Sequence, residues 1–139
     1  MTVRRLLCLA AVLAAAACGS GDDGLAYRAY TDHYVFRITA DPTPPHARER
    51  TRYKVVVRDK DTGQPIEGGE GRIFASSRDG ASTWDSFVAG PEVGTYYANL
   101  NYVVSGDWAV AIQFRRDSTH TLERADWMQE VAPERSSTP

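Results

Sequence analysis

The apolar residues of this chain recur mostly at every second position, and this spacing limits its possible folds more than any other feature. The stretch GTYYANLNYVV places Tyr96, Ala98 and Leu100 on one side and polar neighbours on the other. The stretch WAVAIQF at residues 108–114 repeats the pattern, whereas no long stripe follows the 3.6-residue helical period. Alternation of this kind is typical of an antiparallel strand with one buried face. The chain is therefore expected to be all-β.

Other alternating segments, among them residues 34–38 and 53–57, are separated by turn sequences such as DKDTGQP and DGAS. Asp, Gly and Pro each favour a chain reversal for a backbone reason of their own. About seven short strands spaced by roughly ten residues predict an antiparallel β-sandwich, with a small barrel as the alternative. The segment 122–131, LERADWMQEV, is compatible with an edge strand or a short helix. The strand is favoured.

The N-terminal segment has the pattern of a secretory signal. MTVRR carries two positive charges ahead of the apolar run from Leu6 to Ala17. That run is too short to cross a bilayer, which needs about 20 apolar residues. Its end, Ala-Ala-Ala-Cys18 within LAAAACGSGDDG, resembles the lipobox of bacterial lipoproteins. The resemblance implies cleavage before Cys18 and a diacylglycerol on its thiol; an ordinary secreted protein and a buried helix are the alternatives.

The predicted organisation follows from this signal. Residues 1–17 form the signal peptide, residues 18–31 the lipidated cysteine and a Gly/Ser-rich tether, residues 32–132 the sandwich, and residues 133–139 a disordered tail. Cys8 leaves with the signal, so the mature chain holds a single cysteine and no internal disulfide. The protein is thus expected on a membrane surface of the bacterial cell envelope. Gly19 after the cysteine favours the periplasmic side of an outer membrane, through resemblance to sorted lipoproteins.

The charge balance argues against polyanionic partners. Loss of Arg4 and Arg5 with the signal leaves 16 − 2 = 14 basic side chains against 18 acidic ones, so about −4. A mildly acidic chain is not an obvious partner for nucleic acid or for an anionic lipid surface. No nucleic-acid partner is therefore expected.

Two short motifs link the chain to a known family. They are a turn, Asp61-Gly63-Pro65-Ile66, and a closing hairpin, Gly94-Tyr96 with Gly106-Trp108-Val110-Ile112. Over roughly residues 34–116 the chain resembles the FixH/YtkA-like domains of bacterial envelope proteins. The resemblance implies an immunoglobulin-like β-sandwich of about seven strands. It also raises copper handling related to respiratory oxidase assembly as an alternative function, since relatives have been linked to those tasks.

The candidate metal ligands are scattered along the sequence. Soft metals favour clustered imidazole, thioether or thiolate groups, and the mature chain offers His33, His46, His120 and Met128 besides Cys18. No H-x-H, M-x-x-M or C-x-x-C spacing occurs. We therefore expect no metal site and no cofactor. A calcium-binding loop needs Gly at its sixth position. In DKDTG, residues 59–63, Gly is fifth, so the segment is interpreted as a hairpin turn.

No catalytic constellation is evident. Asp117, Ser118 and His120 are neighbours in sequence, but a catalytic triad is defined by roles in space rather than by adjacency. A non-enzymatic module that binds or supports another envelope component, most simply an envelope protein, is the expected function.

The outward side of the 95–101 strand is the predicted contact surface. Tyr97 faces away from the core together with Asn99 and Asn101, and such a group could stack on a sugar or dock a partner. Coverage by a loop or tail, or simple cross-strand pairing, would equally explain Tyr97. A glycan-binding module, with Tyr97 and Trp84 in one plane, is a further alternative. Trp108 is expected in the core, while Trp84 and Trp127 are not assigned.

Overall fold

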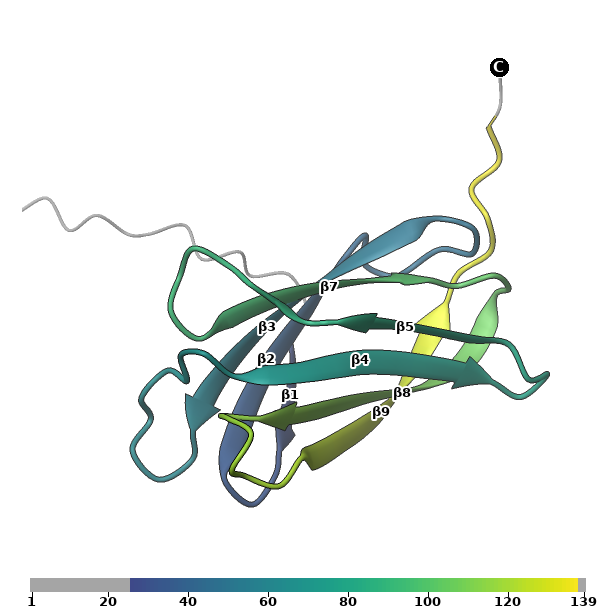
Figure 1. Cartoon of the computed structure of the whole chain (residues 1–139). Coiled ribbons are helices and arrows are strands. Elements are labelled where there is room, and N and C mark those ends of the chain that lie inside the picture. The colour runs from purple at the N-terminus through teal and green to yellow at the C-terminus, as the bar shows by residue number, and fades with distance from the viewer. Residues whose placement is uncertain (1–25, 138–139) are drawn as a thin grey trace, which may run out of the picture.

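The computed structural model describes residues 26–137, which form two β-sheets packed face to face (Figure 1). The strands of this part of the chain are β1 (Tyr27–Tyr30), β2 (Tyr34–Asp41), β3 (Arg50–Asp59), β4 (Glu70–Ser77), β5 (Ser82–Ser86), β6 (Val88–Ala89), β7 (Thr95–Asn101), β8 (Gly106–Arg115) and β9 (Glu123–Val131). One sheet has the order β1-β2-β3-β7-β6 and the other β5-β4-β8-β9, with antiparallel pairing throughout. No helix within these residues is long and apolar enough to cross a membrane.

The topology confirms the predicted sandwich. Strands β2-β3-β7-β6 follow the A-B-E-D order of an immunoglobulin sheet, and β5-β4-β8-β9 extend its C-F-G sheet by one strand. The strand number exceeds the predicted seven because β1 is added at one edge and because residues 82–89 form two short strands, β5 and β6, instead of one. The prediction that the tether extends to residue 31 is wrong, since Tyr27 pairs with Ile38 and Tyr30 with Val35. Residues 122–131 form a strand, as favoured.

The alternating residues lie inward and build the core. One end holds Tyr34, Phe36, Tyr96 and Phe114, whose rings meet largely edge to face, 5.2 Å apart for Tyr34 and Phe114. At the other end Trp108 is fully buried, as predicted, with its ring 5.0 Å from that of Tyr102. Aromatic pairs in this arrangement add stability beyond their buried area. The core is therefore continuous between the sheets without a disulfide in residues 26–137.

The two sheets are joined along one side by the chain itself. Strand β5 belongs to the four-stranded sheet and β6 to the five-stranded one, so the chain changes sheets at Phe87. Beyond β6, the open edge of β7 is covered by side chains from β5. Asp85 accepts a hydrogen bond from the backbone N–H of Asn99 at 2.8 Å, and Thr83 accepts one from that of Asn101 at 3.2 Å. These bonds satisfy donors that an edge strand would otherwise leave open.

The two motifs noted in the sequence meet in space. Gly94 has φ +78°, and a Cβ there would lie 2.6 Å from the Pro65 Cβ. The Tyr96 hydroxyl donates to the Ile66 carbonyl at 2.6 Å and accepts from the Gly69 N–H at 2.9 Å. The closing hairpin thus needs glycine beside the proline turn, since only glycine fits both the space and the backbone angle.

The beginning of the predicted tail is attached to the sandwich. His46 Nδ1 lies 2.9 Å from the Pro133 carbonyl, and Arg135 pairs with Glu49. The predicted disorder of residues 133–139 is therefore wrong for its first part.

Candidate functional site

The outer face of the five-stranded sheet carries a concentration of positive charge. We call this surface the basic face, and it comprises Arg28, Arg37, Arg50, Arg52, Lys54 and Arg58. These residues occupy outward positions of β1, β2 and β3, which alternate with buried positions along each strand. Arg28 is directly opposite Arg37 in the register.

The cations line a series of shallow grooves. A groove of about 470 Å³ has four of them on its walls, together with valines, threonines and the single carboxylate of Glu92. A second groove adjoins it through Lys54 and continues to Arg52 and Tyr97. A third extends along Arg50 towards Asn99. The grooves share lining residues, so they form one continuous surface over the sheet.

Three cations of the basic face form no salt bridge with another described residue, unlike several arginines elsewhere in the fold. Within residues 26–137 no salt bridge involves Arg28, Arg50 or Lys54. Elsewhere arginines pair with nearby carboxylates, in the pairs Arg48–Glu134, Arg115–Glu70, Arg116–Asp59, Arg124–Asp126 and Arg135–Glu49. Cations gathered on one face produce a positive field to which an anion can be attracted.

The structure places the predicted contact residue Tyr97 on this surface. Its ring lies under the Arg52 guanidinium, 4.2 Å from the ring centroid, and it is opposite Lys54 in the register. A Cβ on Gly90 would come within 2.5 Å of the ring, so the glycine leaves the space that Tyr97 occupies. Cross-strand contacts thus account for much of the position of Tyr97, while its remaining surface lines two grooves.

Asn99 and Asn101 follow Tyr97 on the outward side of β7, as the alternation predicts. Asn99 is half-buried and lines the third groove, while Asn101 is exposed at the end of the strand. Sequence reasoning missed the cations beside them, although a signal was present. In RTRYKVVVRD the basic residues occupy alternate positions 50, 52, 54 and 58, the outward set of one strand.

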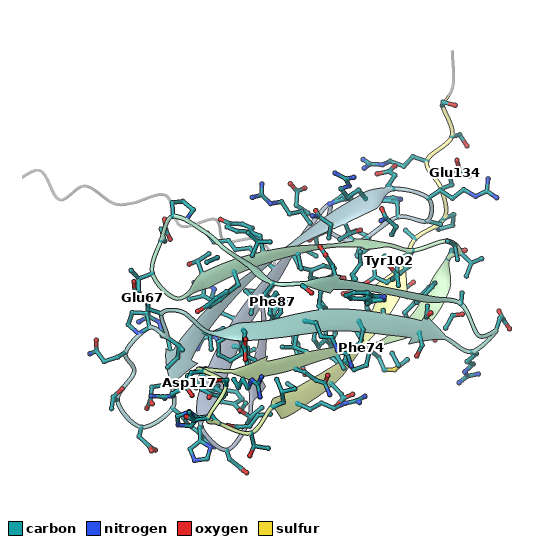
Figure 2. The ribbon with its side chains drawn as sticks, viewed as in Figure 1. Glu67, Phe74, Phe87, Tyr102, Asp117 and Glu134 are labelled. Atoms are coloured by element: carbon teal, nitrogen blue, oxygen red, sulfur yellow. The ribbon has the colours of Figure 1, made fainter. Side chains whose placement is uncertain are left out.

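The candidate metal ligands do not come together. His33 Nδ1 lies 2.9 Å from Glu123, and His120 Nδ1 lies 2.8 Å from Asp117. Figure 2 shows Asp117 and Glu134 at opposite ends of the sandwich, so His120 is distant from His46, which contacts the residue before Glu134. Met128 is exposed on β9. Within residues 26–137 no three His, Cys, Asp or Glu side chains are arranged to hold a metal ion, and Cys18 lies outside the described residues.

The Asp117 carboxylate organises its own turn. Its Oδ1 accepts hydrogen bonds from the backbone and the hydroxyl of Thr119. The Thr119 hydroxyl, followed by the His120 ring, holds the pKa of Asp117 well below its usual range. The group is therefore an ionised turn-forming carboxylate on the surface, and Ser118 lies beside it in the same exposed loop.

DKDTG forms the predicted turn. Asp59 Oδ1 accepts hydrogen bonds from the backbone N–H groups of Asp61 and Thr62 at 2.9 and 3.0 Å. The other carboxylate oxygen pairs with Arg116. The Thr62 N–H, followed by the Arg116 guanidinium, lowers the pKa of Asp59 to about 2. These bonds use the carboxylate oxygens that a calcium ion would need.

The two remaining tryptophans have different environments. Trp84 is 64% exposed and pairs with Phe74 on the outer face of the four-stranded sheet. Tyr97 and Trp84 thus lie on different sheets and do not form one stacking plane. Trp127 is half-buried at the opposite edge, with its ring 5.5 Å from that of Tyr27.

The fold and this surface define the class of the protein as an immunoglobulin-like β-sandwich with one basic sheet face. No known family profile matches the sequence, and no curated protein matches it. Among solved structures, the chain is similar to a DUF4426 family protein from Pseudomonas aeruginosa PAO1, with a TM-score of 0.58 and 14% identity. The similarity covers 79% of this chain and 97% of that protein. At this identity it shows a shared fold.

Proposed function

We propose that this protein is a lipid-anchored, non-enzymatic module of the bacterial envelope that binds another envelope component through the basic face. The supporting observation is the concentration of cations on one sheet face of a chain that is acidic overall; three of them, Arg28, Arg50 and Lys54, form no salt bridge within residues 26–137. Tyr97 and Asn99 line the grooves beside these cations, and Asn101 is opposite Arg50 in the register. The FixH/YtkA-like resemblance agrees with an envelope location.

The anchor is the lipid on Cys18, and the periplasmic side of an outer membrane is its favoured place. Because β1 begins at Tyr27, only residues 19–26 separate the anchor from the sheet. Eight residues span at most roughly 27 Å when fully extended. The sandwich would consequently remain within one domain diameter of the membrane surface.

The alternative functions have less support. Copper handling would need the scattered histidines to converge, and His46 and His120 lie at opposite ends of the sandwich. Glycan stacking would need a shared aromatic plane, and Tyr97 and Trp84 face outward from different sheets. The basic face favours an anionic partner over either.

Two experiments test the proposal separately. Labelling of cells with an alkyne fatty acid should modify the wild-type protein and not the Cys18→Ser variant; an unlabelled wild type would refute the anchor. A photo-crosslinking residue in place of Tyr97 should capture an envelope component in cells. The matched control replaces Trp84 on the opposite sheet. Equal products from both positions would refute the basic face as the contact surface.

A further inference from the structure

We infer that the envelope component contacted by the basic face is the anionic headgroup layer of the membrane that carries the anchor. This inference rests on the proposed lipid anchor and names the partner of the same surface. The sandwich would lie with its five-stranded sheet against the bilayer and its four-stranded sheet towards the aqueous side.

The position of the basic face relative to the tether favours this arrangement. The tether leads directly into β1, which forms an edge of the five-stranded sheet and carries Arg28. The first strand after the anchor therefore already contributes a cation to the basic face. A lipid chain combined with a basic surface is a known two-part scheme for stable membrane attachment.

An aromatic side chain borders the same part of the sheet. Tyr30 on β1 is on the same side of the strand as Arg28 and is 59% exposed. Tyr30 is opposite Val35, which lines the groove between Arg28 and Lys54. Tyrosine is enriched at membrane–water interfaces because its ring is apolar and its hydroxyl polar. Tyr30 thus suits the headgroup region next to the anchor.

The character of the surface favours a membrane over a folded acidic protein. Protein interfaces concentrate their binding energy in buried aromatic or apolar anchors that fill pockets. On the basic face the aromatic candidate Tyr97 is already covered by Arg52. The cations are instead spread over three strands, with threonines and valines between them. A dispersed cationic surface matches a layer of many weak anionic sites.

The net charge did not reveal this surface because it averages over the whole chain. The acidic majority lies elsewhere; Asp107 is opposite Glu130 in the register of the four-stranded sheet, for example. Headgroup charges are felt only within a Debye length of about 8 Å at physiological salt. The face that touches the membrane, rather than the net charge, therefore determines the attraction.

A vesicle-binding assay on the unlipidated mature chain, Cys18→Ser over residues 18–139, tests the inference without the anchor. Co-sedimentation compares phosphatidylcholine vesicles with vesicles that contain about 30% phosphatidylglycerol, at about 0.05 M and about 0.5 M NaCl. We expect binding to the anionic vesicles at low salt and its loss at high salt. Because each cation near an anionic surface contributes roughly five-fold, Arg28→Gln/Lys54→Gln should weaken binding by roughly 25-fold.

The matched control is Arg72→Gln/Arg124→Gln, which removes the same charge from the opposite sheet, where both side chains flank Phe74. This variant should bind within about two-fold of the parent chain, because its charges lie a sheet thickness away from the membrane. Arg28 and Lys54 make no salt bridge in residues 26–137, so their replacement should leave the thermal midpoint unchanged.

Several results would overturn the inference. They are equal loss of binding in both double variants, equal binding to neutral and anionic vesicles, and binding to a polyglutamate peptide without binding to vesicles. The last would assign the face to an acidic protein. Fatty-acid labelling of Cys18 in cells separates the two proposals. If the wild-type protein is labelled but the unlipidated chain does not bind anionic vesicles, the anchor stands and only this inference is contradicted.

Discussion

Replacement of Thr51 by valine should stabilise the protein. Thr51 lies in β3 opposite Leu100, is 0% exposed, and its hydroxyl has no hydrogen-bond partner within residues 26–137. A buried hydroxyl without a partner costs about 1–3 kcal/mol relative to a satisfied or absent one. Valine has nearly the same shape and suits a strand. We therefore expect Thr51→Val to raise the free energy of unfolding by about 1–2 kcal/mol.

Urea denaturation of the two proteins measures this difference. The midpoint should rise while the slope stays constant, since the buried surface does not change. A control is Thr83→Val, which removes the hydroxyl that accepts from the Asn101 N–H at 3.2 Å and should cost about 0.5–1.5 kcal/mol. An unchanged or lower midpoint for Thr51→Val would refute the reasoning, because it would mean that the hydroxyl is satisfied in solution.

Further predictions concern pH and backbone geometry. The pKa of Asp59 is about 2 in the folded protein and about 3.9 when unfolded. The stability that Asp59 contributes is therefore complete above about pH 4 and is lost as the pH falls towards 2. Asp59→Asn should flatten this part of a plot of urea midpoint against pH. Burial raises the pKa of Tyr53 to about 12 and also raises that of Tyr102. Their contribution to stability is therefore complete below about pH 10, the pKa of an unfolded tyrosine, and is lost as the pH rises towards 12. Absorbance titration should show that both phenols ionise only when the protein unfolds; ionisation in the folded protein would contradict their burial. Gly94→Ala should lower the free energy of unfolding by at least about 2 kcal/mol, since its positive φ and the contact with Pro65 both oppose a side chain; a wild-type thermal midpoint would exclude that strain.

The predicted inward residues were largely right because burial of one face imposes period two on the sequence. Tyr34, Phe36, Leu100 and Trp108 are all buried at the alternating positions that indicate strands. The same rule explains what was missed. β1 has one buried residue, Ala29, and the segment of β5 and β6 has none, so neither carries a clear pattern.

The basic face could be predicted only in part, for a different reason. The alternate cations of β3 are visible in the sequence. Their union with Arg28 and Arg37 depends on strand register, which follows from pairings between segments distant in the chain. The net charge of the chain cannot show which charged residues come together on one face. The outward direction of Tyr97, in contrast, follows from alternation within a single strand.

The change of sheets at Phe87 makes the two sides of the sandwich unequal. On the β5–β7 side a covalent crossing and two side-chain hydrogen bonds connect the sheets. On the opposite side β1 and β9 meet mainly through the rings of Tyr27 and Trp127. Local opening costs least where few contacts must break. The two sheets should therefore separate first along β1 and β9, while β5 and β6 keep them together. The amide hydrogens of β1 should accordingly exchange long before those of β7.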